Sequence, residues 1–237
     1  MRTEVLKLST VRTPWALLAA AQVVIVLGAT GPFLRDARGP EAVRSGAAHL
    51  GLTALFALVL GIMAVAGEHR HRTVGDTYLG QPRRGRVLAA KLGVHVGAGA
   101  AFGLIGAVTA LATSAVAVSI SGSSADWSDR ALWQTLVGGI LWNVMFAAVG
   151  VAVGALVGNL TAAVTGALAW LALVEGVVGQ VLGTDLARWL PFSAGAALGD
   201  LPAGGGLSQT AGGLVLAGYT ALLVTAALLI TPRRDIT

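Results

Sequence analysis

The sequence has no cysteine and little charge, and both shortages narrow the class of protein. Only 11% of the 237 residues are charged, whereas a soluble domain carries about 25%. A water-soluble globule needs more charge than this to cover its surface, so a soluble enzyme is excluded. The lack of cysteine excludes a disulfide scaffold. An apolar content of 55% excludes a disordered chain.

What the sequence has is long uncharged stretches. Stretches of about twenty apolar residues can cross a hydrocarbon core about 30 Å thick. Residues 131–183 contain one charge, Glu175, and as one helix they would measure about 80 Å. They therefore form two spans, with a turn at Gly158 and Asn159 and with Thr161 helping to start the next helix. We predict an all-α polytopic membrane protein with six transmembrane helices, at about 14–34, 47–67, 92–120, 131–157, 161–183 and 211–230.

The basic residues predict the orientation, because they concentrate on the cytoplasmic side of membrane proteins. With the N-terminus inside, 11 of the 16 basic residues are cytoplasmic and 5 are external. We therefore expect both termini in the cytoplasm and the chain in the cytoplasmic (inner) membrane. The net charge of +5 then reflects topology and not nucleic-acid binding. Fourteen arginines against two lysines, with much Ala, Gly and Val, indicate a GC-rich bacterium.

Two segments outside the predicted spans have patterns of their own. Near the N-terminus, apolar residues recur at three- and four-residue spacing: Val5, Leu8, Val11 and Trp15. This spacing predicts an amphipathic helix in the membrane interface; a basic tail that only sets topology is the alternative. Residues 184–210 are aromatic and interrupted by proline, which indicates a re-entrant or interfacial hairpin, or else a simple long loop.

The third such segment, residues 68–91, is strongly basic and has the sequence EHRHRTVGDTYLGQPRRGRVLAAK. A turn at residues 80–82 divides it into two short helices. Arg84, Leu88 and Lys91 fall on one face of the second helix, which continues into the third span. A solvated loop that only sets topology is the alternative.

The residue patterns of several enzyme and metal sites are missing. Residues 80–87 (GQPRRGRV) lack the Lys and the hydroxyl that complete a phosphate-binding loop. His69 and His71 point to different faces of a helix, and nearby arginines repel a cation. We therefore expect no catalytic residue, no metal and no cofactor on this chain.

Small and polar residues inside the spans are candidates for packing and transport. Gly150, Gly154 and Gly158 recur at four-residue spacing, which predicts close helix approach. Asn143 and Glu175 are rare polar points and candidates for a translocation pathway. Glu175 is open to three interpretations: a proton relay, a contact with a cationic substrate, or a hydrogen bond to Trp170, Gln180 or a neighbouring helix.

The 68–91 segment resembles that of the ABC-2 type permeases, the membrane subunits of ATP-driven exporters. In that family the second span commonly ends in Glu, followed by a basic stretch, Thr, Leu, Pro, and then Arg and Lys before span three. The matching residues here are Glu68, Arg70, Arg72, Thr73, Leu79, Pro82, Arg86 and Lys91. Arg72 departs from the pattern, because many relatives have Gly before the Thr. The amphipathic start, the six spans and the aromatic segment extend the resemblance over residues 1–237, as a single transmembrane domain.

The resemblance implies a partner. In this family the segment is a cytoplasmic coupling helix that docks on a separate ATPase subunit. Two permease copies, or one copy and a paralogue, bind two ATPase subunits, on which ATP and Mg are expected. The residues implied in coupling would fix the end of the helix, supply apolar contact to the ATPase or pair with its acidic groups. They are Glu68, Arg70, Arg72, Thr73, Tyr78, Leu79, Arg84, Arg86 and Lys91. The few polar groups in the spans favour a hydrophobic or amphipathic cargo, such as a drug, a peptide antibiotic or a lipid.

Two other functions stay open. One is an ion- or proton-coupled secondary carrier that uses Glu175, although the sequence lacks the internal repeat common in carriers. The other is the membrane subunit of a small-molecule importer, which would not need the long basic segment.

Overall fold

The computed structural model describes residues 2–70, 73, 75, 81, 83–181, 183–201 and 206–231. About 87% of the structure is helical and no strand forms in the described residues, which confirms the predicted all-α class. Several residues on which the sequence analysis depends lie outside the described residues: His71, Arg72, Tyr78, Leu79 and Pro82. The predictions made for these residues stay predictions.

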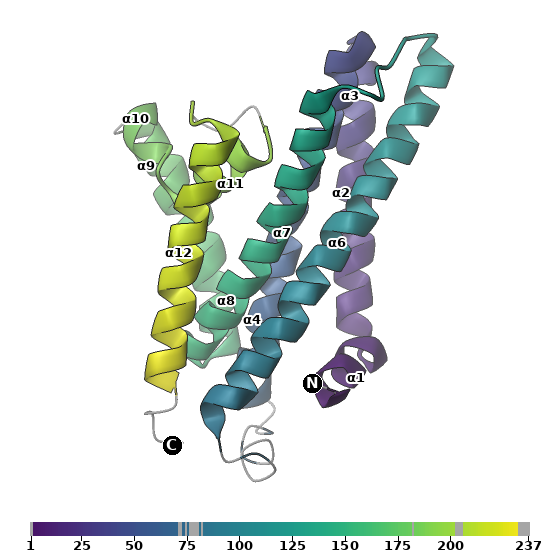
Figure 1. The fold of residues 1–237 in the computed structure, drawn as a ribbon. Helices are drawn as coiled ribbons and strands as arrows, with labels where there is room; N and C mark the ends of the chain where they lie inside the picture. Colours follow the sequence, from purple (N-terminus) through teal and green to yellow (C-terminus); the bar gives the residue numbers. More distant parts are fainter. Residues whose placement is uncertain are drawn as a thin grey trace.

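Among the described residues, five helices are long and apolar enough to cross a membrane. They are α2 (Arg12–Leu34), the run Gly39–Glu68, α6 (Arg84–Ser121), α7 (Arg130–Val157) and α12 (Gln209–Ile230). Figure 1 shows them as a bundle, with α1 (Arg2–Thr10) and the last turn of α12 at the same end. The arrangement is compatible with a multi-pass membrane protein.

The predicted fifth span, 161–183, is helical from Leu160 to Val181 but changes helix type on the way. It consists of α8 (Leu160–Ala169), the π-helical segment η2 (Trp170–Glu175) and α9 (Gly176–Val181). Its apolar part, Leu160–Glu175, is shorter than the five spanning helices. π segments are rare and frequently occur at functional sites. The count of six spans therefore stays a prediction.

Two spans extend beyond the predicted limits. The second begins with α3 (Gly39–Ala48) and passes through the 3-10 segment η1 (His49–Thr53) into α4 (Ala54–Arg70). The 38 residues of α6 measure about 57 Å at 1.5 Å per residue, well above a hydrocarbon core of about 30 Å. The hydropathy pattern placed the ends of these spans at charged residues. The helices extend past those residues, because backbone hydrogen bonding does not depend on side-chain charge.

The predicted turn between α7 and α8 is confirmed. Gly158 has φ of +71°, in the left-handed region that favours glycine, and ends α7. The Asn159 side chain then accepts a hydrogen bond from the N–H of Ala162 at 3.0 Å. Asn159, and not Thr161, therefore caps the next helix.

Glycines bring the backbones of α4 and α7 into contact. A Cβ atom added at Gly150 would overlap the carbonyl oxygen of Leu58, and one at Gly154 would lie 2.7 Å from the carbonyl oxygen of Ile62. Small residues allow this close approach between helices in lipid. The predicted packing role is therefore confirmed for Gly150 and Gly154, whereas Gly158 ends the helix.

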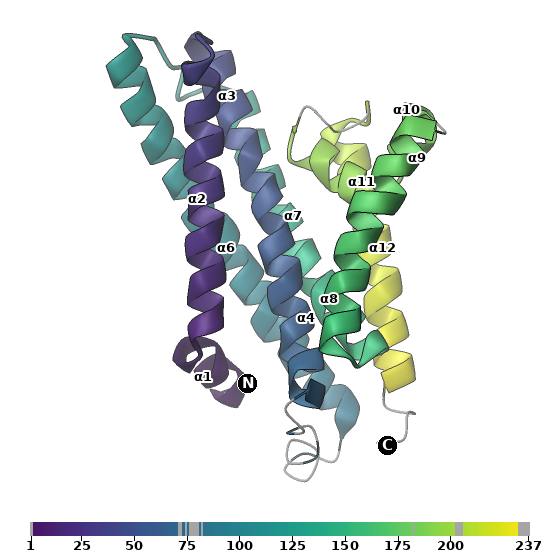
Figure 2. The same cartoon turned by 180° about the vertical axis from the view of Figure 1, so that it is seen from behind.

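The segment 184–210 is more than a simple loop, because it contributes to the core. It contains α10 (Thr184–Ala187) and α11 (Pro191–Leu198). Figures 1 and 2 show α11 beside α12, and its residue Phe192 lies 5.2 Å, ring to ring, from the fully buried Trp142 of α7. Pro191 occupies the first turn of α11, where its missing N–H costs no hydrogen bond.

Candidate functional site

Helix α1 turns a carboxylate toward the bundle. Glu4 is 8% exposed, whereas the apolar Val5 and Leu6 are 54% and 59% exposed. A short N-terminal helix is present, but it ends at Thr10, so that Val11 and Trp15 of the predicted amphipathic pattern lie outside it. Its location in a membrane interface stays a prediction. Its polar side contacts the ends of α4 and α6 through the residues described next.

Lys91 is the centre of a buried ion-pair cluster. Its Nζ atom lies 3.0 Å from Glu4 Oε2, 2.7 Å from Glu68 Oε1 and 3.0 Å from the carbonyl oxygen of Ala64. An ammonium group has three N–H donors, so all three are used. The Lys91 side chain is only 3% exposed. A charge buried this deeply is tolerated when it is paired and fully hydrogen-bonded, which is the case here.

Lys7 completes the cluster from α1. Its Nζ atom lies 2.6 Å from Glu68 Oε1 and 3.4 Å from Glu4 Oε1. We call Glu4, Lys7, Glu68 and Lys91 the ion-pair cluster. Its two carboxylates and two ammonium groups cancel, so the cluster as a whole is neutral.

The pKa values of the two α1 residues reflect this pairing. Burial by itself would raise the pKa of Glu4, but the charges of Lys91 and Lys7 and their hydrogen bonds outweigh burial and hold the pKa below its usual value. Burial would lower the pKa of Lys7, and Glu68 and Glu4 reverse this, so that the pKa is raised. Both groups are therefore charged at neutral pH.

The ion-pair cluster ties three helices together where the 68–91 segment leaves the bundle. It joins α1 to the last turns of α4 and to the early turns of α6. The N–H of Thr73 donates to the carbonyl oxygen of Glu68 at 3.0 Å, so part of the segment is bound to a cluster residue. Glu68, the first residue of the segment, is therefore linked to both α1 and α6.

The sequence analysis selected half of this cluster. Glu68 and Lys91 were predicted as coupling residues, whereas Glu4 and Lys7 were missed. One feature of the sequence could have pointed to Lys7: only two of the 16 basic residues are lysines. In the structure both lysines bond to Glu68 Oε1. A Lys ammonium is compact, whereas Arg carries a planar fork of donors. At 3% exposure, the Lys91 side chain is too buried for the direct partner contact that was predicted for it.

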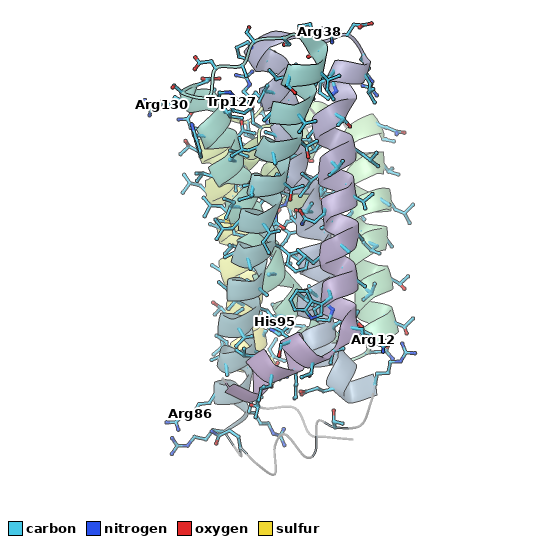
Figure 3. All side chains as sticks on the ribbon, turned by 90° about the vertical axis from the view of Figure 1, so that its right-hand side faces the viewer. Arg12, Arg38, Arg86, His95, Trp127 and Arg130 are labelled. Carbon is cyan, nitrogen blue, oxygen red and sulfur yellow. The ribbon has the colours of Figure 1, made fainter. Side chains whose placement is uncertain are left out.

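The other described coupling candidates lie at the same end of the molecule. Arg70 is exposed at the end of α4, beside a cavity of about 360 Å³ that residues 158–161 also line. Arg84 and Arg86 lie in the first turn of α6. Figure 3 shows Arg86 projecting from this end, with Arg38 and Arg130 at the opposite end.

Asn143 is completely buried and ties α7 to η1. Its side-chain nitrogen donates to the carbonyl oxygens of Gly139 at 2.9 Å and Leu50 at 3.3 Å. Its Oδ1 atom accepts from the Thr53 hydroxyl at 3.1 Å. These bonds give Asn143 a packing role, and its place in a translocation pathway stays a prediction.

Glu175 caps the N-terminus of α11. Its carboxylate accepts hydrogen bonds from the backbone N–H groups of Phe192 at 2.9 Å and Ser193 at 3.0 Å, and from the Ser193 hydroxyl at 3.3 Å. First-turn N–H groups have no partner within their helix and attract negative charge. Of the three interpretations of Glu175, the hydrogen bond to a neighbouring element is therefore observed. A proton relay or a substrate contact stays a prediction.

The geometry defines the class but not the family of the protein. Within the described residues, no group of three or more His, Asp or Glu side chains could hold a metal ion. No protein-family model matches the chain, and no curated protein matches it. The chain is a helical protein with several apolar helices of membrane-spanning length and a buried ion-pair cluster at one end.

Proposed function

We propose that this chain is the permease subunit of an ATP-driven exporter of the ABC-2 type. The observation that carries the proposal is the ion-pair cluster, which joins α1, α4 and α6 at the origin of the 68–91 segment. A permease driven by a separate ATPase needs a stiff connection between its docking segment and its spans. The cluster supplies such a connection, and the resemblance of the segment to the family supplies the partner.

In this proposal the chain has six spans, of which α8, η2 and α9 form the fifth. The end that carries α1 faces the cytoplasm, in the inner membrane of a GC-rich bacterium. Two copies, or one copy and a paralogue, bind two ATPase subunits, which hold ATP and Mg. Closure of the ATPases displaces the 68–91 segments, and each cluster passes the displacement to α1, α4 and α6.

The cargo in this proposal is hydrophobic or amphipathic, such as a drug, a peptide antibiotic or a lipid. Large exposed side chains on the long helices are mostly Val, Leu, Ile and Trp. A pathway between two such subunits would be lined mainly by apolar groups, and an apolar lining favours an apolar cargo. Asn143 and Glu175 are the candidate polar points on it.

Co-purification with an ATPase tests the proposal. The full chain is expressed together with candidate ABC ATPase subunits from the same genome and extracted in mild detergent. Native mass spectrometry should find two permease and two ATPase subunits. Changing Tyr78 and Leu79 together to Ala should weaken ATPase binding at least about tenfold, the factor that about 1.4 kcal/mol represents. Arg83→Lys keeps the charge and is the matched control. A chain that transports its cargo without any ATPase would overturn the proposal.

A further inference from the structure

A cavity of about 420 Å³ lies beside the ion-pair cluster, between α1, α2, α4 and α8. Small-molecule sites typically have about 300–1,000 Å³. Much of its wall is apolar: Leu8, Val11, Leu60, Met63 and Leu160. The cavity also has charged and polar groups, namely Glu4, Lys7, Glu68 and His95. Both kinds of surface in one cavity suit an amphipathic ligand.

The two lysines of the cluster differ in the number of N–H donors that they leave for a ligand. Lys91 uses its three N–H donors within the protein. Lys7 uses two, on Glu4 and Glu68, and its side chain is 51% exposed. One N–H of Lys7 is therefore available to an acceptor such as a phosphate oxygen.

His95 supplies a hydrogen-bond acceptor to the cavity. Its Nδ1 atom lies 2.9 Å from the carbonyl oxygen of Lys91, and a carbonyl oxygen only accepts, so Nδ1 carries the hydrogen. In the neutral ring Nε2 is then an acceptor, and no described residue donates to it. His95 lines the same cavity as the α1 residues Glu4 and Lys7. The carboxylate of Glu4, which lines the same cavity, also accepts hydrogen bonds.

We propose that this cavity binds the headgroup of a zwitterionic phospholipid with a primary ammonium group, of the phosphatidylethanolamine class. Lys7 donates to the phosphate. The ammonium group donates to Glu4 and to Nε2 of His95. The first carbons of the acyl chains lie along Leu8, Val11 and Met63.

Charge and hydrogen bonding favour this headgroup over the other common ones. The cluster is neutral, so a neutral zwitterion adds no net charge, whereas an anionic headgroup would face the carboxylates of Glu4 and Glu68. A choline headgroup is quaternary and has no N–H to donate to His95. The apolar wall, together with the exposed apolar side of α1, favours a membrane lipid over a free headgroup.

Native mass spectrometry of the full chain tests this site. The protein is purified from mixed micelles with equal amounts of ethanolamine, choline and glycerol phospholipids of identical acyl chains. We expect the ethanolamine lipid to be retained at least about tenfold over the choline lipid, because a hydrogen bond to a charged group contributes at least that factor. His95→Phe keeps a ring without the acceptor and should lower this ratio several-fold.

A matched pair of variants locates the site. Val11→Trp fills the cavity and should reduce retention of the ethanolamine lipid, whereas Val23→Trp, at an exposed position outside the cavity wall, should not. If Val11→Trp fails to fold, the ratio of retained ethanolamine lipid to choline lipid in His95→Phe decides whether the cavity is the binding site. Excess glycerophosphoethanolamine should not displace the lipid.

Three results would overturn the proposal: equal retention of ethanolamine and choline lipids, preference for the anionic glycerol lipid, or an unchanged ratio in His95→Phe. Displacement by the soluble headgroup would assign the cavity to a free ligand instead of a lipid. The inference needs only a location at the membrane interface, so failure to bind an ATPase would leave it intact.

Discussion

The ammonium group of Lys91 lies 3.0 Å from a carboxylate oxygen of Glu4, a residue 87 positions earlier in the chain. Their side chains are 3% and 10% exposed. The pair attaches a surface helix to the start of a span. Because Lys91 also binds Glu68, the same ammonium connects α1 to the first residue of the 68–91 segment.

Replacing Lys91 by Met should release α1 from α4 and α6. Removing one partner of a buried ion pair costs about 3–5 kcal/mol, because the other charge stays buried without it. The chain has no cysteine, so a single Leu8→Cys reports on α1, and its maleimide labelling should become at least about tenfold faster. Ser9→Cys, at an exposed position, should label equally fast in both backgrounds. Slow labelling of Leu8→Cys in both would contradict a structural role for Lys91.

Arginine should not replace Lys91. A planar guanidinium group cannot direct three donors at Glu4, Glu68 and the carbonyl oxygen of Ala64 from the same buried position. Lys91→Arg should therefore lower the thermal unfolding midpoint in detergent, whereas Lys7→Arg, at a half-exposed side chain, should leave it nearly unchanged. Equal midpoints for the two variants would refute the geometric argument.

The docking of α1 should depend on pH at both extremes. The pKa of Glu4 is lowered, so its contribution to stability is present above the ordinary Glu value of about 4.3 and is lost as pH falls through the lower folded value. The pKa of Lys7 is raised, so its contribution is present below about 10.4 and is lost as pH rises through the higher folded value.

A nitroxide at Ser9→Cys measures this dependence. Its mobility should stay low between about pH 5 and 10, the window that these ordinary values bracket, and should increase on either side. Glu4→Gln should raise the nitroxide mobility at neutral pH and remove most of its change at acid pH. Glu68 and Lys91 still face α1 in this variant, so the effect reports on the Glu4 carboxylate alone. A mobility independent of pH would show that the ion-pair cluster does not hold the helix.

Adding a methyl group at Gly150 should separate α4 from α7. Its Cβ atom would overlap the carbonyl oxygen of Leu58, and overpacking of this kind costs about 1–3 kcal/mol. Gly150→Ala should therefore unfold at a lower temperature. In Gly218→Ala, the matched control, the Cβ atom has no neighbour within 4 Å, so the midpoint should stay or rise slightly. The opposite order would contradict the backbone contact.

Glu175→Gln should loosen α11. The amide keeps one oxygen that can accept from Phe192 or Ser193, but its NH2 group faces the other N–H donor. At least one bond to a charged acceptor, worth about 1.5–3 kcal/mol, is therefore lost. A cysteine at Ala194, which is 0% exposed, should then become reactive to maleimide. Gln180→Ala, at an exposed position on α9, is the control. If Ala194→Cys stays protected while transport loses its pH dependence, Glu175 acts as a proton carrier and not as a cap.

Parts of the candidate site could be predicted because their signals are local. Glu68 ends an apolar stretch, and Lys91 begins the next at helical spacing from Arg84 and Leu88. The pairing of Lys91 with Glu4 has no such signal, since it depends on how α1 folds back against α6. The same holds for Glu175, whose partners on α11 follow it by 17 and 18 residues.

The sequence by itself determined the all-helical class, the long apolar helices, the turn at Gly158 and the presence of a helix at the N-terminus, because hydropathy, charge and capping act over a few residues. Only the tertiary structure decided that the polar side of α1 faces inward, that Lys91 is buried among two carboxylates, and that Glu175 caps α11. A charge can be buried only where another element supplies its partner, and that choice depends on how the helices pack.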